Sequence, residues 1–360
     1  MGLKRSDRAP WYRGSRFRAV AGIVFVVGLA AAGVYAINGQ TSELSGSLAL
    51  LENSDVDLIA IAVVAEALSV VTFGVFNWYL LRVGLKQVPP FKAIAVSLAS
   101  TTINNSVPGG AAFSAVYAFR EFRSFGADPV FASWTVLAIN LLSGVGLAIL
   151  ATLGVVASLQ VSQGLGLFVV VPLLAMVLFG LAALVATPTL LVKVVGPPLR
   201  LVSRILVRIG RDGFSAQAIT ARLLAVKPSF LRVVVAITLA LANWVFDATV
   251  LVLAYYSIHS SVPWRGLLLA YGAGQLAANL PVTPGGLGVV EGSLSIALVA
   301  YGGAQESAVA AVLIYRLVSF WMTIPFGWIS YFGTSVIRKR RPAMVRERFG
   351  ILIADEDPVP

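Results

Sequence analysis

Four ionisable side chains lie inside long apolar stretches of this chain: Glu66, Asp247, Glu291 and Arg316. A charge at the centre of a bilayer costs roughly 2.5–3.5 kcal/mol or more, so each is expected to face the interior of a helical bundle. Arg316 suits an anionic head group, because a guanidinium donates two parallel hydrogen bonds to a phosphate. Glu291 would then be its counter-ion or a proton carrier. The alternative is a structural salt bridge between Glu291 and Arg316.

The segment that carries Glu291 is predicted to break a membrane helix. Residues 281–293 read PVTPGGLGVVEGS and lie between two apolar runs, 266–280 and 287–301, each about 15 residues long. A bilayer needs about 20 helical residues, so neither run spans alone. A break at membrane depth is tolerated only where protein or a wet cavity covers its backbone, and the helix that follows aims N–H groups at an anion. The residues expected to form or flank this break are Asn279, Pro284, Gly285 and Gly286.

A weaker copy of this break occurs in the first half of the chain. Residues 104–113 read NNSVPGGAAF, and Pro108-Gly109-Gly110 superposes on Pro284-Gly285-Gly286 when the two halves are aligned at a fixed offset. Two broken apolar segments at corresponding places in two halves point to a transporter binding site. A chance match of a common turn is the alternative, and the surrounding topology has to decide between them.

The same offset relates polar residues of the two halves. Arg316 corresponds to Asn140. Glu66 and Asp247 lie in the spans that begin the two halves, and their separation is slightly larger than the offset. Asn104 flanks the first break and could satisfy freed backbone groups. All of these residues are candidates for substrate binding.

Composition indicates the class of protein. Hydrophobic residues make up 58% of the chain and charged residues 12%, where a soluble domain carries about a quarter charged residues. The sequence therefore predicts an all-α polytopic membrane protein. With no cysteine, one histidine and no HExxH, GxSxG or Walker motif, we expect no metal, no cofactor and no enzymatic activity. The basic residues lack the interleaved aromatics of a nucleic-acid groove, so no nucleic-acid partner is expected.

The distribution of basic residues predicts the orientation in the membrane. Cytoplasmic loops carry the excess of Lys and Arg, so the basic tail 1–18 and the tail 337–360 are placed inside. The retained first helix, about 19–38, then leads to an acidic outer loop, 39–57. This assignment leaves only Arg265 and Arg316 away from the cytoplasmic side.

The predicted domain organisation is an inverted-topology repeat. Six spanning helices and two re-entrant hairpins are expected, the first entering from inside and the second from outside, with their tips meeting near the midplane. The alternative is eight full crossings with each broken segment as one kinked span. The ranges are 19–336 for the transmembrane domain, about 58–158 for repeat one, 189–232 for a basic cytoplasmic connector and about 233–336 for repeat two.

One motif resembles a known family. LPVTPGGLGVVEG at 280–292 is similar to the C-terminal signature of the lysylphosphatidylglycerol synthase transmembrane, or flippase-like, family of bacterial membrane proteins, and the resemblance covers about 20–336. The family's first motif usually has Pro, then a Gly-Glu pair and a basic residue, whereas 107–116 reads VPGGAAFSAV without the acid. Relatives with lysyl transfer carry a soluble aminoacyltransferase domain. The chain ends at Pro360 without one, so that activity is not expected.

The resemblance implies movement of a lipid between leaflets of the cytoplasmic membrane. The substrate would be an anionic or aminoacylated phospholipid or a polyprenyl-linked glycan. Two other hypotheses are an intramembrane lipid-modifying enzyme with Glu291 as general base, and a non-catalytic membrane partner of a cell-envelope synthase.

Overall fold

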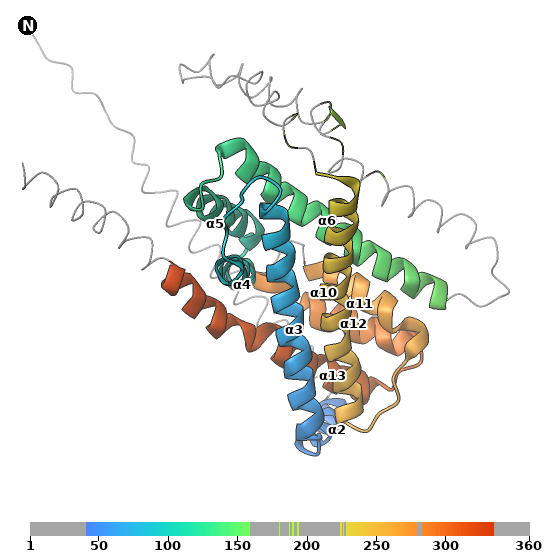
Figure 1. Cartoon of the computed structure of the whole chain (residues 1–360). Coiled ribbons are helices and arrows are strands. Elements are labelled where there is room, and N and C mark those ends of the chain that lie inside the picture. Colours follow the sequence, from blue (N-terminus) through green and yellow to red (C-terminus); the bar gives the residue numbers. More distant parts are fainter. Residues whose placement is uncertain are drawn as a thin grey trace, which may run out of the picture.

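The computed structural model describes residues 41–158, 228–278 and 283–334, with isolated positions between 180 and 226. Within these ranges all regular secondary structure is helical (Figure 1). The helices long and apolar enough to cross a membrane are α3 (Val56–Leu81), α6 (Pro129–Ser158), α10 (Phe230–Ser257) and the stretch Gln305–Thr334. The chain is therefore a polytopic helical membrane protein.

Several predicted segments lie outside the described residues. They are both tails, the span 19–38, and most of the connector 189–232.

The last long span is not one uniform helix. It begins as α13 (Gln305–Arg316), continues as a π-helical turn, η3 (Leu317–Trp321), and resumes as α-helix to Thr334. A short helix, α2 (Thr41–Glu52), packs against α13 and precedes α3. Single π-helical turns of this kind occur frequently at functional sites.

The two leading spans, α3 and α10, pack against each other in opposite directions (Figure 1). Each starts at a capping side chain, Asp55 for α3 and Ser229 for α10. The bonds that join them along their length include Asp55 N to Ser257 O (2.7 Å), Asn243 Nδ2 to Ser69 Oγ (2.8 Å) and an Arg232 N–H to Arg82 O (3.5 Å). This antiparallel crossing agrees with the predicted inverted repeat.

The first broken segment forms a helical hairpin of α4 (Pro90–Ser106) and α5 (Gly110–Ser124), whose arms pack together. It starts beside the end of α3, where the Trp78 indole donates to Val88 O (2.8 Å). The hairpin also ends there. Gly84, which precedes α4, packs against Phe131 in the first turn of α6, and a Cβ on Gly84 would lie 2.7 Å from Cζ of Phe131. Both ends of this hairpin therefore lie at one end of the bundle.

The second broken segment has the same form at the opposite end. Its arms are α11 (Trp264–Ala278) and α12 (Val289–Ala300), and the short 3-10 turn η2 (Pro284–Gly286) lies in the break between them. Gly266, at the start of α11, packs against the ring of Tyr301, just after α12. Because α3 and α10 are antiparallel, the two hairpins enter from opposite ends. The structure has the hairpin form and not the single kinked span.

The hairpin tips meet, and the last span crosses both of them. α4 packs against η2, where a Cβ on Gly285 would lie 3.1 Å from the Asn105 carbonyl oxygen. Further along the last span, Gly327 packs against Thr102 of α4. The hydroxyls of Tyr117 and Thr334 are 2.9 Å apart, which joins α5 to the same span. Any movement of a hairpin therefore changes its contacts with this span.

Corresponding elements of the halves are regularly spaced along the chain. The separation between their first residues is nearly constant, as the pairs Val56 and Phe230, Pro90 and Trp264, Gly110 and Val289, and Pro129 and Gln305 show. The lipid-facing sides of the long helices carry exposed apolar side chains, such as Ile61, Val64 and Leu68 on α3. Such a surface is what acyl chains require.

Candidate functional site

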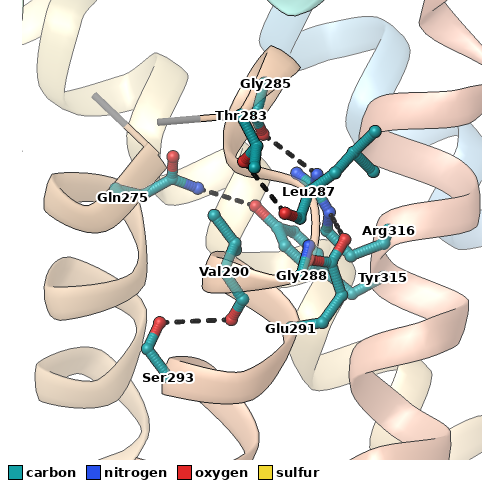
Figure 2. A network of polar contacts seen from close by, with 10 residues as sticks. All are labelled: Gln275, Thr283, Gly285, Leu287, Gly288, Val290, Glu291, Ser293, Tyr315 and Arg316. Atoms are coloured by element: carbon teal, nitrogen blue, oxygen red, sulfur yellow. Dashed lines mark hydrogen bonds and ion pairs between the residues drawn. The ribbon is translucent and has the colours of Figure 1, made fainter. Parts of the chain in front are cut away.

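The tip of the second hairpin is built by its glycines and by Glu291. Gly285, Gly286 and Gly288 have φ values of 55°, 69° and 80°, a left-handed backbone that residues with a Cβ rarely adopt. The chain can therefore turn sharply after Pro284. The N–H of Gly288 donates to Oε2 of Glu291 at 2.7 Å, so this carboxylate caps the start of α12 (Figure 2).

Arg316 closes this tip from the last span. Its Nε donates to Oε1 of Glu291 at 2.6 Å, and one of its terminal nitrogens donates to the Gly285 carbonyl at 3.1 Å (Figure 2). The guanidinium carbon lies 4.1 Å from the centre of the Phe320 ring, on the π-helical turn. Arg316 is only 7% exposed, and Glu291 lies nearer to the surface.

This arrangement can exchange one anion for another. A guanidinium has five N–H donors, and the described residues accept from two of those of Arg316. A phosphate oxygen presents the same acceptor chemistry as the Glu291 carboxylate, with more charge. A head group that reached the tip could replace Glu291 on Arg316 and use the remaining donors.

A second polar cluster surrounds Asp247 in the middle of α10. Oδ2 of Asp247 accepts hydrogen bonds from the Tyr271 hydroxyl, from Gln275 Nε2 at 3.2 Å and from the Tyr315 hydroxyl at 2.8 Å. Gln275 also donates to the Tyr315 oxygen at 2.7 Å (Figure 2). Tyr315 precedes Arg316 in the chain, so the two clusters are adjacent.

Glu66 joins this cluster from α3. The carboxyl groups of Glu66 and Asp247 lie close enough to share a hydrogen bond, and both residues are buried. Glu66 Oε2 has no hydrogen-bond partner among the described residues. The equivalent leading spans thus bring their two acids together where they cross.

Sequence reasoning missed Tyr271, Gln275 and Tyr315. The available signal was the spacing of Tyr271 and Gln275, which lie one helical turn apart in an apolar segment and therefore on one helical face. Tyr315 had the weaker signal of being adjacent to a buried charge.

The other sequence candidates lie elsewhere. Pro108, Gly109 and Gly110 form the first hairpin tip, and Asn104 beside them donates to Oδ1 of Asn105 at 3.5 Å. Asn279 lies outside the described residues.

Asn140 occupies the position in α6 that Arg316 has in the last span, but it faces outward. Its side chain is exposed and donates to Val136 O in its own helix at 2.8 Å. It lines a groove of about 450 Å³ between α5 and α6 and does not reach the Arg316 site. The physical reason is packing. α13 is covered by α2, α10 and α12, whereas in the described part of the chain this side of α6 is flanked by α5.

The long apolar helices and the charged hairpin tip define a polytopic membrane protein with a polar site buried between its helices. The chain belongs to the family described as the lysylphosphatidylglycerol synthase TM region, whose model matches residues 17–327. This confirms the resemblance carried by the TPGGLGVVE string.

A curated relative is a UPF0104 membrane protein of Methanothermobacter thermautotrophicus (strain Delta H). It is 43% identical over 67 residues, which cover 18% of this chain and 20% of that protein. The family connects this membrane protein to lipid processes of the cell envelope.

Proposed function

We propose that this protein moves a lipid with a phosphate-bearing head group between the leaflets of the bacterial cytoplasmic membrane, as a transporter and not as an enzyme. The observation that carries the proposal is the buried Arg316 guanidinium at the break of the second hairpin, held between Glu291 and the Gly285 carbonyl. Ionisable residues inside a membrane bundle are rare and mark substrate or ion pathways, and transporter sites lie at broken helices.

The placement of the hairpins supports alternating access. They begin at opposite ends of the antiparallel α3–α10 pair, and their tips meet where α4 contacts η2. Withdrawal of one hairpin would open the tips to one side, and withdrawal of the other would open them to the opposite side. In this mechanism the head group replaces Glu291 on Arg316 while the acyl chains stay against the exposed apolar faces of the spans.

The substrate class follows from shared chemistry. An anionic phospholipid and a polyprenyl-linked glycan both present phosphate oxygens, which a guanidinium binds in the same manner. By the distribution of basic residues, both termini would be cytoplasmic, with the connector between the repeats on the anionic inner leaflet.

The experiment is leaflet-resolved transport in liposomes that contain the purified protein. Fluorescent phosphatidylglycerol tests the phospholipid, and a fluorescent polyprenyl-phosphate sugar tests the glycan carrier. We expect wild type to accelerate one of them and Arg316→Ala to slow it at least tenfold. Arg265→Ala is the matched control, because it removes an exposed arginine from the start of the same hairpin. All variants are first checked for a monodisperse folded state.

Three results would contradict the proposal. A folded Arg316→Ala protein with an unchanged rate would remove Arg316 from the pathway. Chemical conversion of a lipid by wild type in detergent, where no leaflets exist, would indicate a lipid-modifying enzyme. Movement of neither probe by wild type would favour a role as a partner of a cell-envelope synthase.

A further inference from the structure

We propose that Glu66 and Asp247 form a proton-binding site whose occupancy depends on the position of the second hairpin. The claim that proton binding is coupled to hairpin movement rests on the proposed transport function, and it would supply the energy source for that transport. The proton site itself can be tested without any transport.

The first argument is the contact between the two carboxyl groups. Glu66 on α3 and Asp247 on α10 lie close enough at the helix crossing for their carboxyl groups to share a hydrogen bond, and both residues are more than nine-tenths buried. An ionised carboxylate only accepts hydrogen bonds, so a bond between two carboxyl groups requires a proton on one of them. Two negative charges in contact would also repel strongly in this low-dielectric setting.

The second argument is the unequal supply of donors. Asp247 accepts from the side chains of Tyr271, Gln275 and Tyr315. Glu66 Oε2 has no donor among the described residues. Three donors favour the ionised form of Asp247, so the proton belongs on Glu66. The pair then holds one proton and one negative charge while the hairpin is docked.

Other ionisable groups near the pair fit this charge state. Arg316 on the last span attracts the Asp247 carboxylate, while its ion-pair partner is Glu291. The remaining groups that face the pair are the phenols of Tyr271 on α11 and Tyr315 on α13. α6, which packs against α10 and α11, contains no ionisable side chain.

The third argument connects this site to the hairpin. Two of the three donors to Asp247, Tyr271 and Gln275, belong to α11, an arm of the hairpin. The third, Tyr315, is adjacent to Arg316, which holds the hairpin tip through Glu291. If the hairpin moves away, Asp247 loses two donors, and its carboxylate takes a proton from water. Docking returns that proton to water, so one proton is exchanged in each cycle.

Thermodynamic linkage makes this exchange reciprocal. A hairpin position that changes proton affinity must itself respond to proton concentration by the same factor. A proton gradient could therefore bias the direction in which the hairpin carries lipid.

Infrared spectroscopy of the purified protein at neutral pH tests the proton site directly. We expect a carboxylic-acid C=O band from a buried protonated acid in wild type, and its loss in Glu66→Gln, where the amide can donate to Asp247. Glu291→Gln is the control and should keep the band, because Glu291 is held in an ion pair with Arg316 and does not belong to the Glu66–Asp247 pair. Absence of the band in wild type, or its survival in both Glu66→Gln and Asp247→Asn, would overturn the site. A band that sodium chloride removes and potassium chloride leaves would show a sodium site instead.

Transport across an imposed pH gradient tests the coupling. With one proton exchanged for each lipid, a gradient of one pH unit should bias the lipid distribution by up to about tenfold in wild type. Asp247→Asn should abolish that bias, because Asp247 is the group that takes up and releases the exchanged proton. Lipid movement that ignores the gradient in wild type would overturn the coupling and leave the proposed function intact. If wild type moves no lipid, the proposed function and the coupling both fail, and the infrared result alone decides the proton site.

Discussion

The two hairpin tips have similar backbone conformations but differ in their charged side chains. Both contain Pro-Gly-Gly, and in both the first glycine is left-handed, with φ of 67° at Gly109 and 55° at Gly285. Both are followed by a helix that packs back on the preceding arm. The break itself is thus a repeated feature of the architecture.

The sites beside the tips differ. At the offset that superposes the two Pro-Gly-Gly turns, Glu291 and Arg316 correspond to Ala115 and Asn140. Ala115 and Asn140 line the same groove of about 450 Å³ between α5 and α6. The space that an ion pair occupies in the second half is therefore a neutral groove in the first. The comparison indicates that the scaffold needs both breaks, whereas only the second of the two tips carries an ion pair.

The largest effect should come from breaking the ion pair. Arg316→Ala leaves Glu291 and the Gly285 carbonyl without their partner, and removal of one member of a buried pair costs about 3–5 kcal/mol. We expect about 3 kcal/mol, because Glu291 keeps 23% of its side chain exposed. Unfolding in mixed detergent micelles, followed by tryptophan fluorescence, measures this loss.

The double variant Arg316→Ala/Glu291→Ala sharpens that result. It should recover part of the lost stability, because no charge is then left without its partner. A double variant that is less stable than the single one by the full effect of Glu291→Ala would show that the two side chains act independently.

An intermediate effect should distinguish the two tips by their glycines. Gly109→Ala meets no atom within 4 Å, so it costs only the left-handed backbone, about 1–2 kcal/mol. Gly285→Ala adds a collision of the new Cβ with the buried Phe320 ring, which also stacks on Arg316. We expect Gly285→Ala to be the more destabilising of the two in the same unfolding assay. Equal losses of stability in the two variants would mean that the Phe320 ring moves aside without an energetic cost.

The sequence could predict the breaks because their cause is local. Proline removes a backbone donor and glycine favours the left-handed turn wherever they occur, so both tips could be placed from residue types alone. The lengths of the four long helices followed from bilayer thickness in the same way. The antiparallel leading spans agree with the direction that charge placement assigned to them.

The sequence could not predict which side chains meet, because that depends on how each helix is rotated in the bundle. Tyr271, Gln275 and Tyr315 meet Asp247 only because α10, α11 and α13 pack around one point. Glu66 could be identified as a buried acid, but not as a contact of Asp247. Asn140 shows the converse. The offset gives its equivalence to Arg316, but its exposure depends on which described helices pack against that face of α6.

The smallest effect should be at Asn140. Because the side chain is exposed and bonds only to its own helix, Asn140→Ala should change stability by less than about 0.5 kcal/mol and leave lipid movement at the wild-type rate. The liposome assay and the unfolding assay used for Arg316→Ala measure both quantities. If Asn140→Ala instead slowed transport as much as Arg316→Ala, the neutral groove would be part of the lipid pathway. Both halves would then contribute to lipid movement, and not only the half that contains the ion pair.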